Sequence, residues 1–60
     1  MKGWIEAHTS DGDRFSVQIK HISDFFPKFD GTSLTMDGTR GILVMESYDD
    51  VMRMIEEAQP

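Results

Sequence analysis

The stretch GILVMESYDDVMRMIEEA, residues 41–58, joins an apolar segment directly to a well-marked amphipathic helix. Ser47 is a residue type that caps helix N-termini, and Asp50 three positions later completes a pair that resembles a capping box. Glu46 and Asp49 add negative charge at the positive end of the helix dipole. Farther along, apolar residues recur at the spacing of one buried helix face: Tyr48, Val51, Met52, Ile55 and Ala58. A helix of about three turns is marginal alone in water, so the upstream chain must supply a surface for it to cover.

The upstream residues predict five short strands separated by turns. The clearest is residues 14–20, where Phe15, Val17 and Ile19 alternate with polar residues. Asp-Gly pairs at 11–12 and 37–38 predict hairpin turns, and residues 29–32 are expected to turn the chain as well. Pro27 cannot donate to a ladder, so the strand beside it is expected at a sheet edge. The expected strands are residues 2–9, 14–20, 22–26, 33–36 and 39–45.

Together these elements predict one small α+β domain, residues 1–60. Its twisted antiparallel sheet follows the order β-β-β-β-β-α, with the C-terminal helix packed on one face. Ile5 and Ala7 are expected to face the helix, and Trp4 and His8 to face away from it. A chain of 60 residues buries only about 60% of its unfolded surface, and without cysteine it has no disulfide or thiolate zinc site. Self-association is the supplement we favour.

Two apolar features predict binding surfaces. Residues 42–45 are apolar at every position, which is typical of a strand buried on both sides and predicts a dimer or higher homo-oligomer. The alternative is a curled sheet that buries both sides within one chain. Three of the four phenylalanines lie within residues 25–29, where they either close the core or anchor a partner. The surface expected for a protein partner or self-association comprises Trp4, Phe25, Phe26, Phe29, Leu43 and Met45.

The charge of the chain is strongly acidic. Six basic and eleven acidic side chains give a net charge of −5, so direct nucleic-acid binding is not expected. This acidity either keeps the protein in solution or docks it on a basic partner. If the ligand were an anionic nucleotide, its base would stack on Trp4 or Phe26. The cations expected to contact the phosphate are Arg14, Lys28 and Arg40, in or beside turns.

The sequence carries no pattern that indicates catalysis. Gly-x-Ser-x-Gly, His-Glu-x-x-His and phosphate-loop motifs are all missing, so we expect no enzyme activity, no cofactor and no metal. His8 with Asp11 or Asp13 would make at most a weak metal site, and a surface role explains these residues better. Helix capping likewise accounts for the carboxylates around Ser47.

The N-terminal residues do not resemble a leader. Glu6 interrupts the first apolar run, and no apolar run approaches the roughly 20 residues of a membrane span. A cytoplasmic location and no membrane partner are therefore expected.

From Ile5, His8 and Asp11-Gly12 near the N-terminus to the strand-to-helix segment of residues 44–51, most of the chain resembles a group of very small bacterial and phage proteins that includes the flagellar FlbD/SwrD-type proteins. The Phe-Phe-Pro-Lys-Phe segment and the acidity depart from the flagellar pattern. The matching positions are Ile5, His8, Asp11, Gly12, Val17, Ile22, Gly38, Val44, Glu46, Ser47, Asp49, Asp50 and Val51.

The resemblance implies a strand-to-helix fold signature without a catalytic residue. Similar short proteins occur on phages and mobile elements, where compact acidic proteins bind host defence proteins or sequester nucleotide signals. The expected function is therefore a non-enzymatic interaction protein, phage or mobile-element encoded, that blocks a larger host protein. The alternatives are a protein that sequesters a nucleotide signal and a flagellar accessory protein.

Overall fold

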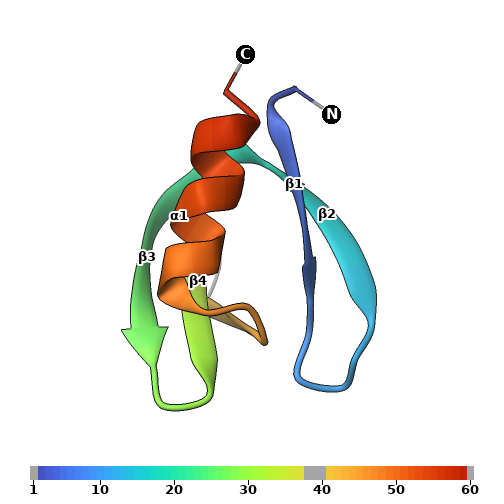
Figure 1. Ribbon diagram of the computed structural model, residues 1–60, viewed down its shortest axis with the longest axis vertical. Coiled ribbons are helices and arrows are strands. Elements are labelled where there is room, and N and C mark those ends of the chain that lie inside the picture. Colours follow the sequence, from blue (N-terminus) through green and yellow to red (C-terminus); the bar gives the residue numbers. More distant parts are fainter. Residues whose placement is uncertain (1, 38–40, 60) are drawn as a thin grey trace.

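The computed structural model describes residues 2–37 and 41–59. Five strands are followed by one C-terminal helix, so the predicted α+β fold is confirmed. Figure 1 shows this helix, in orange and red, lying over the strands. In chain order the elements are β1 (Trp4–His8), β2 (Arg14–Gln18), a 3-10 turn (Ile19–His21), β3 (Ile22–Lys28), β4 (Gly31–Met36), β5 (Gly41–Val44) and α1 (Tyr48–Glu57). Within the described ranges no helix has the length and apolar character needed to cross a membrane.

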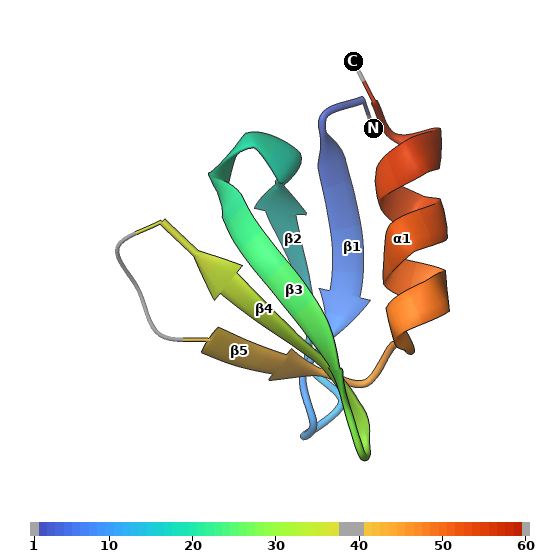
Figure 2. The same cartoon turned by 90° about the vertical axis from the view of Figure 1, so that its left-hand side faces the viewer.

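The strands form two antiparallel sheets rather than one continuous meander. β1 pairs with β2, and the second sheet has the order β3-β4-β5. A bridge between Thr9 and Val44 joins the sheets, and the Met45 amide donates to the His8 carbonyl oxygen over 2.8 Å beside it. Figure 2 shows the two sheets diverging from this junction, with α1 alongside β1. The helix contacts β1, β3 and β4, and so packs against both sheets.

The core lies where the two sheets meet the helix. Ile5 and Ala7 of β1 point into it, as expected from their alternation with Trp4 and Glu6. Leu34 and Val44 are completely buried and come from neighbouring strands of the second sheet. The buried apolar side chains of the core are Ile5, Ala7, Val17, Leu34, Val44 and Val51.

The buried face of α1 includes Met54 in place of the predicted Met52. Val51 is completely buried, but Met52 is 38% exposed, so its predicted place on the core face is wrong. The stripe is centred on Val51, and the positions three, four and seven residues after it share its face. The partly buried helix residues that pack against the core are Met54, Ile55 and Ala58.

The β3–β4 hairpin is longer than expected at both of its inner ends. β3 continues through Pro27 because it is an edge strand, where the missing amide donor leaves no ladder bond unmade. β4 begins at Gly31. This glycine has a φ of +154°, and a Cβ added to it would overlap the Val44 carbonyl oxygen. The absence of a side chain at Gly31 thus lets β4 run close to the end of β5.

Of the two Asp-Gly turns expected, the structure describes the first. Gly12 has a φ of +90°, and the Thr9 amide donates to the Asp13 carbonyl oxygen over 2.8 Å to close the loop. The first hairpin turn is therefore confirmed. The second expected turn includes Gly38, which lies outside the described residues.

Candidate binding surface

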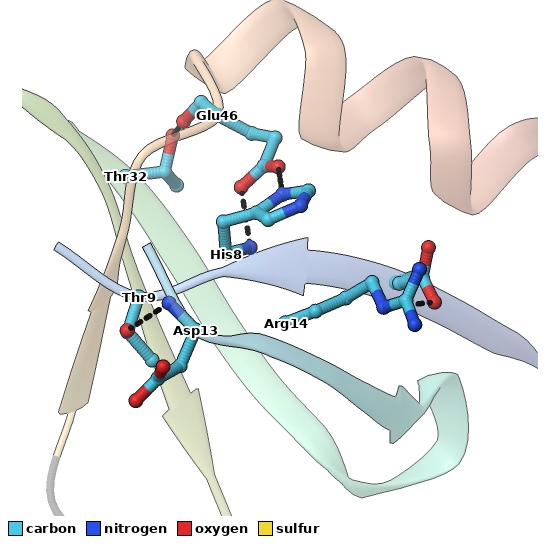
Figure 3. Close-up of polar contacts among 7 residues, drawn as sticks. His8, Thr9, Asp13, Arg14, Thr32 and Glu46 are labelled. Atoms are coloured by element: carbon cyan, nitrogen blue, oxygen red, sulfur yellow. Dashed lines mark hydrogen bonds and ion pairs between the residues drawn. The ribbon is translucent and has the colours of Figure 1, made fainter. Parts of the chain in front are cut away.

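A polar cluster ties β1 to the segment between β5 and α1. The His8 amide donates to Glu46 Oε1 over 3.0 Å, and His8 Nδ1 lies 2.7 Å from Glu46 Oε2 (Figure 3). From β4, the buried Thr32 hydroxyl donates to the Glu46 backbone oxygen over 2.8 Å. These bonds span both sheets and the start of the helix, so the cluster holds the three units together.

The ionisation of Glu46 follows from this arrangement. Burial alone raises the pKa of the Glu46 carboxyl, but hydrogen bonds from the His8 side chain and amide outweigh it and hold the pKa below its ordinary value of 4.5. An ionised carboxylate only accepts, so Nδ1 of His8 is the donor. His8 thus pairs with Glu46 rather than with Asp11 or Asp13. Among the described residues, no three potential metal ligands come together.

The second sheet has one face on the core and one facing outward. Residues paired directly across neighbouring strands project to the same face. Phe26 pairs with Ser33, and Ser33 pairs with Leu43, whereas Leu34 next along β4 points into the core. Phe26 is 44% exposed, and Met45, just beyond β5, is 55% exposed. We call Phe26, Leu43 and Met45 the outer patch.

A groove adjoins the outer patch at the tip of the β3–β4 hairpin. Phe29 occupies the turn, and its side chain is completely exposed. The groove has a volume of about 480 Å³ and separates the hairpin tip from the first turn of α1. We call it the tip groove, and its apolar, aromatic and cationic lining residues are Pro27, Lys28, Phe29, Met45 and Tyr48. Met45 also belongs to the outer patch, so the two surfaces are continuous.

Two other aromatic residues expected on the same surface lie elsewhere. The Phe25 ring is on the core side of β3, with its centroid 5.1 Å from that of Tyr48. Trp4 begins β1 and lies beside Met54 and Ala58, at the far end of the helix from Tyr48. The structure therefore brings together four of the six expected residues and separates Phe25 and Trp4 from them.

The expected anion contacts are also dispersed. Arg14 Nε lies 3.6 Å from a Glu6 carboxylate oxygen (Figure 3), and Arg14 pairs with His8, at the opposite end of β1 from Trp4. Lys28 Nζ lies 5.1 Å from the centroid of the Phe26 ring. Arg40 is outside the described residues.

Some residues that lie side by side in the structure had no detectable signal of this proximity in the sequence. His8 and Glu46 are 38 residues apart, and only the bridge between the two sheets places them in contact. The structure also places Lys20 beside Trp4 and Lys2, because β1 and β2 are antiparallel and bring their outer ends together.

No protein-family model, no curated protein and no solved structure matches this chain. The relation to FlbD/SwrD-type proteins stays a prediction from the residues of the strand-to-helix junction. The geometry and chemistry of the chain's own residues are therefore the basis on which its function is inferred.

Proposed function

We propose that this protein is a non-enzymatic interaction protein that binds a larger protein through the tip groove. The observation that carries the proposal is Phe29, whose ring is completely exposed at a hairpin turn beside the apolar side chain of Met45. An aromatic ring held out on a short turn can enter a pocket on a partner with little loss of conformational entropy. Burial of such a ring is a common source of interface affinity.

Three polar residues around the tip groove, Glu46, Ser47 and Asp50, have structural roles that support action by contact. Glu46 is engaged by His8 and supports the junction of the two sheets. Ser47 accepts a hydrogen bond from the Asp50 amide over 3.2 Å and so caps α1. Asp50 in turn pairs with Arg53 over 2.8 Å.

The outer patch has a different proposed partner, which is a second copy of this chain. A single copy leaves Phe26 44% exposed and Met45 55% exposed, so the outer side of residues 42–45 lacks the cover that a strand buried on both sides would have. Packing two outer patches face to face, about 10 Å apart, would cover Phe26 and Leu43 in a two-fold symmetric interface. The added burial would stabilise a domain with a small core.

The biological setting that we propose comes from the resemblance and the charge. A net charge of −5 favours a partner with a basic surface, because complementary charges steer association. A phage or mobile-element protein that blocks a host defence protein fits this description. A flagellar accessory role is the alternative, and it predicts motility genes beside the gene for this chain.

Photo-crosslinking at position 29 tests the main proposal. A photoreactive phenylalanine analogue replaces Phe29, and the control carries the same group at the exposed Ser16 on β2. We expect a defined protein from host lysate to crosslink at position 29 alone. Excess wild-type protein should compete for this product, and Phe29→Ser should not. The same products at both positions, or chaperones only, would contradict the proposal.

Light scattering tests the proposed self-association through the outer patch separately. We expect a dimer for the wild type and a monomer for Leu43→Ser, with Ser16→Ala as a matched control that stays dimeric. A monomeric wild type at high concentration would remove the self-association and leave the crosslinking result unaffected.

A further inference from the structure

Trp4 stands between two grooves at the end of the molecule where β1 begins and α1 ends. One groove, of about 580 Å³, has the carboxylates of Glu6 and Glu57 in its lining, and Lys2 lines both grooves. The other, of about 410 Å³, has two lysines and two glutamines beside the indole and no carboxylate among its described lining residues. We call this second space the Trp4 groove, and the residues that carry its chemistry are Lys2, Trp4, Gln18, Lys20 and Gln59.

Backbone hydrogen bonds hold the walls of the Trp4 groove in place. The Gly3 amide donates to the Ala58 carbonyl oxygen over 2.6 Å, and the Ile19 amide donates to the Gly3 carbonyl oxygen over 2.9 Å. Gly3 has a φ of +82°, which a side chain would strain. Trp4 and Gln18 are directly paired, so both side chains project from the same face of the β1–β2 sheet. The groove is thus formed before any ligand arrives.

The charge of the Trp4 groove contrasts with that of the whole chain. Arg14 and Arg53 are each paired with a carboxylate, and Lys28 lies over the Phe26 ring. Lys2 and Lys20 form no ion pair with any described residue, although the chain has almost twice as many acidic as basic side chains. Two cations that no described residue neutralises, beside one aromatic ring, favour an anionic ligand with a planar part.

We infer that the Trp4 groove binds a nucleoside monophosphate. The base stacks on the Trp4 indole, and the Gln18 and Gln59 amides can each donate to and accept from its edge. Lys2 and Lys20 contact the phosphate. The volume of about 410 Å³ lies within the range of small-molecule sites, and the carboxylates of the opposite groove repel an anion from that side of the ring. This site is separate from the tip groove and does not depend on the function proposed for it.

Tryptophan fluorescence provides a direct test, because Trp4 is the only tryptophan of the chain. AMP and GMP are titrated into the full-length protein at low salt. We expect a saturable change in emission with at least one of them. Adenosine and inorganic phosphate each carry only part of the recognised chemistry, so both should bind at least about tenfold more weakly than AMP.

Charge variants assign the phosphate contacts. The double variant Lys2→Gln/Lys20→Gln should weaken binding about tenfold or more, and Lys28→Gln, which removes a lysine far from Trp4, should not change it. Circular dichroism verifies that each variant is folded, and calorimetry repeats the titration without the indole as reporter. No saturable change with AMP or GMP, equal binding of adenosine and AMP, or an equal loss in Lys28→Gln would each overturn the inference.

Discussion

The two faces of the β3–β4–β5 sheet differ in what they contribute to the protein. The inner face places Leu34 and Val44 in the core, where neither side chain is exposed. The outer face, one residue away along the same strands, leaves Phe26 and Met45 44% and 55% exposed. Stability therefore depends on one face, and the association that we propose depends on the other. Because the side-chain direction alternates along each strand, substitutions at adjacent positions can separate the two properties.

The largest expected effect comes from a matched leucine pair. Leu34→Ala on the inner face should destabilise the fold by about 3–5 kcal/mol, because it leaves a cavity in a completely buried site. Leu43→Ala on the outer face should cost less than about 1 kcal/mol in the separated monomer. Urea unfolding at a protein concentration too low for association compares the two free energies of unfolding. Equal losses of unfolding free energy in the two variants would mean that both faces of the sheet contribute alike to stability.

A smaller loss is expected where β4 approaches the end of β5. Gly31→Ala should destabilise by about 2–3 kcal/mol, because the new Cβ meets the Val44 carbonyl oxygen and the φ of +154° disfavours a side chain. Gly41→Ala is the control, since its closest contact would be the Ser33 hydroxyl, which can rotate away. Thermal unfolding measures both. A similar melting temperature for the two variants would contradict the close approach of the strands.

Glu46→Gln tests the hydrogen bonds that connect β1 to the segment between β5 and α1. Loss of the charged hydrogen bonds with His8 should cost about 1–2 kcal/mol at neutral pH. The folded state lowers the pKa of Glu46, so its contribution is present above pH 4.5 and is lost as the pH falls through the folded pKa. The variant should therefore lose less stability on acidification than the wild type, as urea unfolding at a series of pH values would measure. Glu56→Gln on the exposed side of α1 is the control, and it should change the free energy of unfolding at neutral pH by less than about 0.5 kcal/mol.

The smallest expected effect concerns an ion pair that faces solvent. Arg53 and Asp50 are 2.8 Å apart on α1, with side chains 62% and 46% exposed. Arg53→Ala should change the free energy of unfolding by no more than about 0.5 kcal/mol, because solvent screens such pairs. Urea unfolding of Arg53→Ala and Glu46→Gln under the same conditions compares the two losses of unfolding free energy. Equal losses would show that burial does not distinguish the Arg53–Asp50 pair from the His8–Glu46 pair.

Much of the fold could be predicted from local patterns. Phe15 and Val17 alternate with polar residues, Gly12 follows Asp11 at a tight turn, and Ser47 caps a helix, because each signal acts within a few residues of the chain. The prediction for Met52 is wrong for a related reason. Its spacing from Tyr48 fits a helical stripe, but both sheets pack on the face centred on Val51, which only the tertiary contacts decide.

The candidate surfaces could be predicted only in part. The sequence holds more apolar residues than one helix can cover, and Phe26, Phe29, Leu43 and Met45 are among that excess. Their grouping on one side, and the separation of Trp4 from them, depend on strand register between segments far apart in the sequence. Lys20 has no local signal that places it beside Trp4, since a lysine near a turn is ordinary in any sequence.

The sequence by itself determined the order of the elements, the capped helix, the first hairpin turn and the excess of apolar side chains, because periodicity and turn chemistry are short-range. Only the tertiary structure decided that the strands separate into two sheets and that His8 meets Glu46. It also placed Lys20 beside Lys2 and the one tryptophan. His8 and Glu46, like Trp4 and Lys20, are far apart in the chain and carry no local signal for one another, so packing alone brings each pair together.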